Sequence, residues 1–193
     1  MYKRRQGALA LICCGAAITV CALADRPPKA PAIYFLSRTY HLASFNQKDK
    51  PMWEFVSGDE TVDAWTTRLT IIDRPDARSG TEIARAEAGI KSDYEAHGGK
   101  ILMAKTLNSS NAEYSYTVVG TDDPAKQRYE ISFVKAGMSQ RNGYVAIYDV
   151  RISDPTDYVG KAKLFLHQHS AEVGNALGQM NLPDISRLPR TEF

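Results

Sequence analysis

Apolar and polar residues alternate along several stretches of this chain, which is the pattern of β-strands that bury one face. The alternation is clearest at 113–119, 128–134 and 144–152, and shorter strand-like stretches lie at 32–40, 52–56, 65–73 and 100–107. Tyrosines mark the apolar face of the regular strands, as at Tyr114, Tyr129 and Tyr148. Short, turn-rich links join the last four strands, so we expect them to pair as antiparallel neighbours.

One stretch between the strands changes to the three- and four-residue spacing of an amphipathic helix. Ser79 and Glu82 form a capping-box pattern at its start, in which each side chain satisfies a free backbone donor. Gly98 and Gly99 end it, as glycine does where the backbone turns left-handed. The apolar face that this predicts consists of Ile83, Ala86, Ile90, Tyr94 and His97.

A second, longer helix is expected after the last strand. Asp154 or Thr156 is predicted to cap it, and Pro183 ends it. Its apolar stripe consists of Ala162, Leu166, His169, Val173, Leu177 and Met180. The order of elements therefore predicts an α+β fold, in which an antiparallel sheet of about six strands is packed with two main helices.

The first 24 residues have the pattern of an export signal. A basic start at 3–5 is followed by an uncharged run from Gly7 to Val20, and Ala22-Leu23-Ala24 supplies the small residues that precede signal cleavage. We therefore expect a periplasmic or secreted protein. The alternative is an uncleaved segment that anchors the chain in the inner membrane through residues 7–24.

The remaining chain divides into three parts. Residues 25–31 form a proline-rich spacer, 32–182 a single α+β domain, and 183–193 a flexible C-terminal tail. About 165 residues, from Asp25 on, can bury enough apolar surface to fold without disulfides. This matters because the three cysteines, Cys13, Cys14 and Cys21, all lie in the leader, so the mature chain has no thiol.

Removing the leader also changes the charge of the chain. The whole sequence carries 24 basic and 22 acidic residues, and the three basic residues of the leader account for its excess, so the mature chain has 21 basic residues and a net charge of −1. A nearly neutral domain has no overall field that attracts nucleic acid or anionic lipid. We expect no nucleic-acid partner, and membrane contact only through a retained leader.

The order of elements over residues 51–181 resembles that of the PsbP/Mog1-like superfamily, in which an antiparallel sheet is packed between helices. A second likeness is local: Trp53-Glu54-Phe55-Val56, Glu60 and Trp65-Thr66 lead into Leu69-Thr70-Ile71, which is similar to small exported bacterial proteins of uncharacterised function. The resemblance implies a binding or assembly factor rather than an enzyme.

No group of residues has the spacing of a catalytic or metal site. His167 and His169 would converge on a metal from a strand, but on a helix they point about 200° apart. The segment 137–141 lacks the second glycine of a nucleophile elbow. The carboxylates between residues 54 and 73 are better explained as solvated surface groups than as a glycosidase pair. We expect no catalytic residue, no bound metal and no cofactor.

Two functions remain open. The favoured one is a non-enzymatic binding or assembly module of the cell envelope, which docks a protein partner through the sheet face or through loops 58–64 and 138–142. Trp53, Trp65 and Glu60 are its candidate binding residues, although the strand tyrosines are more simply explained as packing beneath the helices. The pattern indicates no particular oligomeric state.

The alternative is a small hydrolase, or a ligand or lipid carrier. It would use a cleft between the sheet and the C-terminal helix, with Tyr148, His169 and Glu172 as polar lining. Because no catalytic constellation accompanies these residues, the sequence favours a protein that is not an enzyme.

Overall fold

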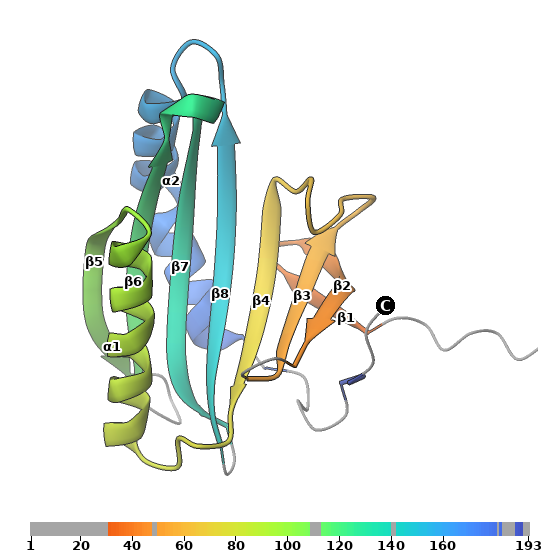
Figure 1. Ribbon diagram of the computed structural model, residues 1–193, viewed down its shortest axis with the longest axis vertical. Coiled ribbons are helices and arrows are strands. Elements are labelled where there is room, and N and C mark those ends of the chain that lie inside the picture. Colours follow the sequence, from red (N-terminus) through yellow and green to blue (C-terminus); the bar gives the residue numbers. More distant parts are fainter. Residues whose placement is uncertain are drawn as a thin grey trace, which may run out of the picture.

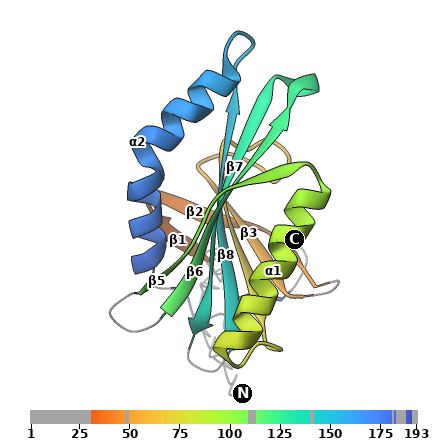
Figure 2. The same ribbon diagram turned by 90° about the vertical axis from the view of Figure 1, so that its left-hand side faces the viewer.

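Eight antiparallel strands form one sheet, and each face of the sheet carries one helix (Figures 1 and 2). The computed structural model describes residues 31–47, 50–108, 113–139, 142–180, 182 and 188–190. The predicted leader 1–24 and nearly all of the predicted spacer 25–31 lie outside the described residues. The predicted α+β class, with an antiparallel sheet and two main helices, is confirmed.

The strands follow the chain in two meanders that meet in the middle of the sheet. The strands are β1 (Ala32–Phe35), β2 (Arg38–Asn46), β3 (Met52–Ser57), β4 (Thr67–Arg74), β5 (Gly99–Asn108), β6 (Glu113–Asp123), β7 (Arg128–Ser139) and β8 (Asn142–Ser153). The helices are α1 (Gly80–Ala96) and α2 (Tyr158–Gln179), and a short 3₁₀ turn, η1, spans Pro124–Lys126. The sheet order is β1-β2-β3-β4-β8-β7-β6-β5, so α1 carries the chain from β4 to the far edge.

The sheet curls until its first edge faces its middle. Phe35 of β1 and Tyr148 of β8 are separated by three strands in the sheet order, yet their ring centres lie 5.1 Å apart. In a flat sheet, four strand spacings would place them about 19 Å apart. The concave face therefore encloses the larger core, against which α2 packs.

Helix α1 begins as the sequence predicts. The Ser79 hydroxyl accepts a bond from the Glu82 amide at 3.3 Å, and Glu82 in turn accepts one from the Ser79 hydroxyl at 3.0 Å. Gly98 ends the helix with a φ of 84°, which favours glycine. Ile83 and Ala86 pack on the convex face of the sheet, beside a smaller core of Ala77, Val134, Ala136, Val145 and Ile147.

Helix α2 starts later than the sequence predicts. Its cap is Asp157, which accepts a bond from the Gly160 amide at 2.9 Å, and not Asp154 or Thr156. Asp154 instead accepts bonds from the amides of residues 156 and 157, and so holds the turn before the helix. In the described part of the chain, neither this helix nor α1 is long and apolar enough to cross a membrane.

The strand count corrects the sequence expectation of about six. The predicted strand 32–40 is a hairpin, because Leu36 and Ser37 form a two-residue turn between β1 and β2. Both residues have positive φ, 46° and 61°, which such turns require and which usually selects asparagine or glycine. Since neither residue type is present, the sequence carried no signal for this turn.

Three residues of the predicted flexible tail are described, and all three contact the sheet. Leu188 is buried against the concave core. The Pro189 carbonyl accepts a bond from the Trp53 indole nitrogen at 2.7 Å. The Arg190 guanidinium lies 3.7 Å from the Asp73 carboxylate. This part of the tail is thus packed rather than free.

Candidate functional site

A pocket of about 230 Å³ opens between α2 and the concave face of the sheet. We call it the α2 pocket. It is lined by Leu36, Arg38, Thr67, Tyr148, Phe165, His169, Glu172 and Val173. Three of these, Tyr148, His169 and Glu172, are the residues that the sequence placed in a cleft beside the C-terminal helix, and the structure brings them together there.

The β1–β2 hairpin forms one wall of the α2 pocket. Its turn places Leu36 at the wall, and Arg38 follows as the first residue of β2. A left-handed conformation at a residue other than glycine costs of order 1–3 kcal/mol, and such strain is common at functional sites. The surrounding core therefore holds this wall in an unfavourable backbone conformation.

The floor of the α2 pocket is a chain of hydroxyl groups. The Tyr40 hydroxyl donates to Thr67 Oγ1 at 3.1 Å. Burial raises the pKa of Tyr148, and the neighbouring Tyr40 raises it further. Tyr148 therefore stays protonated as a donor. Because Thr67 Oγ1 accepts the bond from Tyr40, its own proton is free for a further acceptor, and no described residue takes it.

Helix α2 supplies the opposite wall. The His169 ring packs against Phe165 in a tilted arrangement, with ring centres 4.9 Å apart. His169 Nδ1 lies 3.2 Å from Glu172 Oε2, which is the ordinary reach of residues three apart on a helix. His167, two residues away, is exposed, so the two histidines do not share a face.

The charges at the rim of the α2 pocket have opposite signs. Arg38 is exposed and forms no ion pair with any residue that the structure describes. Glu172 is 65% exposed at its side chain, and His169 is its hydrogen-bond partner among the described residues. The pocket thus combines an apolar interior with one cationic and one anionic group at its mouth.

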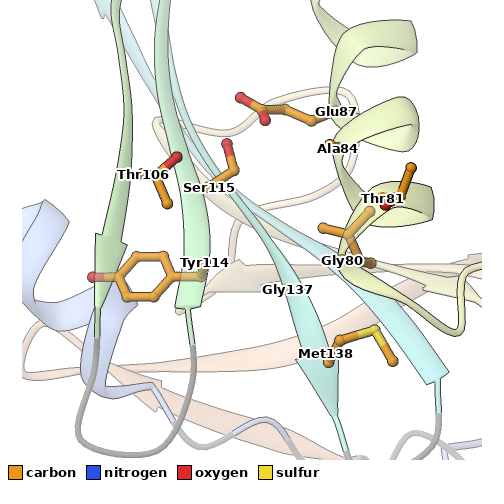
Figure 3. Close-up of a pocket in the computed structure, with 10 residues that line it drawn as sticks. Gly80, Thr81, Ala84, Glu87, Thr106, Tyr114, Ser115, Gly137 and Met138 are labelled. Atoms are coloured by element: carbon orange, nitrogen blue, oxygen red, sulfur yellow. The ribbon is translucent and has the colours of Figure 1, made fainter.

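A second pocket, about 410 Å³ in volume, lies between α1 and strands β5 to β7 (Figure 3). Thr81, Glu87, Thr106, Ser115 and Met138 line it. Its carboxylate is already neutralised, because Glu87 Oε1 accepts bonds from Lys91 at 2.6 Å and from the threonine at 117 at 2.7 Å. Although this pocket is larger, its charged group is satisfied within the protein, and we regard the α2 pocket as the candidate site.

The two tryptophans predicted to bind a partner are buried. Trp53 is fully buried in the concave core beneath the described part of the tail. Trp65 is 4% exposed and lies between two guanidinium groups, with Arg151 at 3.8 Å and Arg68 at 4.4 Å from its ring centre. Neither ring can contact a partner without a rearrangement of the residues that cover it.

Glu60 lies in the loop between β3 and β4 and closes it. Its Oε1 accepts bonds from the Thr66 amide at 3.0 Å and from the Thr66 hydroxyl. Its Oε2 is buried without a partner among the described residues. These contacts explain Glu60 as a loop-ordering residue next to Trp65.

A row of charged residues crosses the convex face of the sheet. The Arg68 guanidinium donates to Glu54 at 2.8 Å and to Asp149 at 3.0 Å. The Ser132 hydroxyl donates to Asp149 at 2.6 Å. Burial raises the pKa of Asp149, and Arg68 offsets only part of that effect. These groups satisfy one another, so the row contributes to the structure of the sheet rather than presenting a free site.

Metal ligands do not gather in the part of the chain that the structure describes. Among those residues, no group of three or more histidine, cysteine, aspartate or glutamate side chains could hold a metal ion. Within the α2 pocket, sequence reasoning missed Arg38, Thr67 and Phe165. Thr67 and Arg38 come from strands whose place beside α2 depends on the curl of the sheet, for which the sequence offers no local signal.

Comparison with known proteins gives little further information. The sequence matches no protein-family model and no curated protein. Twelve solved chains have a similar structure. One is the crystal structure of a protein of unknown function, PA94, from Pseudomonas aeruginosa, with a TM-score of 0.44 and 11% identity over 80% of this chain and 97% of that chain. At this level of similarity the match supports no argument about function, and the resemblance to the PsbP/Mog1-like superfamily stays a prediction.

Proposed function

We propose that this protein is an exported, non-enzymatic binding module that takes a small ligand into the α2 pocket. The observation that supports this most is the convergence of polar side chains from three elements on one apolar cavity: Arg38 from β2, Tyr148 from β8, and His169 with Glu172 from α2. Pockets that combine apolar walls with a few placed polar groups are typical ligand sites.

The chemistry of the lining favours binding over catalysis. The raised pKa keeps Tyr148 protonated, so it can donate a hydrogen bond but cannot act as a base at neutral pH. The Thr67 hydroxyl is bonded to Tyr40 and not to His169, so no base is in place to activate it as a nucleophile. Hydrogen-bond donors without an activated nucleophile suit recognition.

The binding proposal is tested by screening the mature chain against small molecules by thermal shift, with native mass spectrometry of the hits. We expect hits that His169→Ala weakens at least fivefold. His167→Ala is the matched control, because His167 lies on the same helix but is exposed, and we expect it to bind as the wild type does. Hits that both variants bind equally well, or an absence of hits, would contradict the proposal.

Export is a separate part of the proposal, and it rests on the leader pattern in residues 1–24. The protein recovered from the cell envelope should have an intact mass that corresponds to a chain starting at Asp25. A mass that retains residues 1–24 would support the membrane-anchored alternative instead.

A second candidate function, docking of an envelope protein, is supported by the β5 edge of the sheet. Leu102 and Met103 are 44% and 40% exposed on this last strand, whose outer backbone is unpaired among the described residues. Such edges accept a further strand. A photo-crosslinking residue at Leu102 should then capture a partner in intact cells, whereas one at the exposed Arg85 should not.

A further inference from the structure

The shape and charge of the α2 pocket indicate what kind of ligand it would take, and this inference rests on the function proposed above. A volume of about 230 Å³ corresponds to the liquid volume of roughly eight water molecules, at about 30 Å³ each. Phe165, Leu36 and Val173 supply apolar walls. The ligand is therefore small, with an apolar part that fills the interior.

One side of the mouth favours an anionic group. The Arg38 guanidinium has no ion-pair partner among the described residues, and Thr67 has a hydroxyl proton to donate. A carboxylate accepts both a hydroxyl proton and a guanidinium fork, and it is small enough for this pocket. Tyr40 supports this side indirectly, because its hydroxyl donates to Thr67 Oγ1 and so leaves the Thr67 proton for the ligand.

The other side of the mouth favours a cation. Glu172 uses one carboxylate oxygen toward His169, and the second oxygen has no bond to a described residue. An anion alone would be repelled by Glu172, and a cation alone would be repelled by Arg38. A ligand that carries both charges avoids each repulsion and satisfies both groups.

We propose that the α2 pocket binds a free α-amino acid with an aliphatic side chain. The carboxylate lies toward Arg38 and Thr67, the ammonium group lies toward Glu172, and the side chain packs against Phe165, Leu36 and Val173. Each charged contact is partly exposed, so the removal of either charge from the ligand should weaken binding about fivefold, and not by many orders of magnitude.

The test measures, by isothermal calorimetry, the binding of three probes to the full mature chain: L-leucine, N-acetyl-L-leucine, which lacks the cation, and L-leucinamide, which lacks the anion. We expect leucine to bind about fivefold more tightly than either derivative. Glu172→Gln should abolish the preference for leucine over N-acetyl-leucine, and Arg38→Gln should abolish the preference over leucinamide. Arg78→Gln, an exposed arginine next to α1, should change neither.

The outcomes separate this inference from the proposed function. Equal binding of the three probes by the wild type, or preferences that survive both substitutions, overturns the amino-acid proposal. If none of the three binds while the small-molecule screen yields hits sensitive to His169→Ala, the ligand class is wrong and the binding function stands. If the screen fails as well, both are overturned.

Discussion

The two faces of the sheet are built from different chemistry, although the same strands supply both. On β8, Tyr148 points into the concave core and its neighbour Asp149 points to the convex face. The concave side is a continuous cluster of aromatic and aliphatic side chains around α2. The convex side carries the charged row beside α1. Apolar burial thus dominates the concave face, whereas the convex face combines a smaller apolar core with charged groups that depend on their partners.

The largest effect is expected on the concave face, at Phe133. This residue is fully buried, and its ring centre lies 6.3 Å from that of Tyr148 and 6.4 Å from that of Phe165. Phe133→Ala should lower the free energy of unfolding by about 3–5 kcal/mol, because it leaves a cavity in a close-packed core. Urea denaturation at low and at high salt measures this loss of stability, which should be the same at both salt concentrations.

Phe133→Leu is the control, since it keeps most of the buried volume and should cost only about 1 kcal/mol. A loss below 2 kcal/mol for the alanine variant, by the scale of large-to-small core changes, would mean that the concave core collapses around the gap.

On the convex face, the removal of Arg68 should lower the free energy of unfolding by slightly less than Phe133→Ala does. Arg68→Ala leaves the buried Asp149 carboxylate without its cationic partner, and we expect the free energy of unfolding to fall by about 2–4 kcal/mol. The distinguishing result is the double variant: Arg68→Met with Asp149→Leu removes both charges and should recover most of the stability. Urea denaturation of the wild type, Arg68→Met, Asp149→Leu and the double variant forms the cycle. A double variant no more stable than Arg68→Ala would show that the pair itself stabilises the fold.

The contrast between the faces also explains how much of the fold was predictable from the sequence. The helix from Ser79 to Gly98 was predictable because its cap and its end depend on neighbouring residues. The inward tyrosines were predictable because alternation fixes which residues share a face, and Tyr114, Tyr116 and Tyr148 are indeed buried. Local chemistry encodes both features directly.

The sequence could not reveal which distant strands face each other. The pairing of Arg68 with Asp149 follows from the register between β4 and β8, which are 81 residues apart at this point. The covering of Trp53 by Pro189 spans 136 residues. The same contrast holds for the candidate site. The sequence predicted the pocket residues Tyr148 on β8 and His169 and Glu172 on α2, whereas the position of Arg38 beside them depends on the curl of the sheet.

Lys135 is the exception on the concave face, and its substitution should have a smaller effect. It is 5% exposed, and its ammonium group donates to the Leu177 carbonyl at 2.9 Å at the end of α2. Its Nζ also lies 4.9 Å from the ring centre of Tyr114. At pH 7, Lys135→Met should cost about 1–2 kcal/mol, because a charge-assisted bond is lost while the cost of burying the charge is also removed.

The pH dependence of this variant checks the explanation. Burial lowers the pKa of Lys135 below its ordinary value of 10.5. The unfolded chain therefore binds more protons than the folded one between the two pKa values, and the stability contributed by Lys135 rises as the pH rises through that interval. The difference between the wild type and Lys135→Met should widen in favour of the wild type as the pH rises from 7 towards 10.5. A difference in stability that stays constant or narrows would contradict this explanation of the role of Lys135.

The smallest effect is expected where the carboxylate of a charge pair is exposed to solvent, at Asp76 in the loop before α1. Both of its oxygens accept bonds from Arg74, at 2.8 and 3.0 Å, but its side chain is 57% exposed. The hydrogen bonds from Arg74 lower the pKa of Asp76 from 3.8 to about 2. Solvent screening limits the stabilisation to about 0.5 kcal/mol.

Because the folded pKa of Asp76 is depressed, its contribution is complete above pH 4 and is lost as the pH falls towards 2. Asp76→Asn should therefore lower the free energy of unfolding by about 0.5 kcal/mol at pH 7 and by almost nothing at pH 2, as urea denaturation at the two pH values would measure. Asp76→Asn leaves the Arg74 guanidinium, whose side chain is 11% exposed, with an amide oxygen that can still accept one of its hydrogen bonds. A loss as large as that of Arg68→Ala would show that the exposure of the Asp76 carboxylate does not limit what the pair contributes.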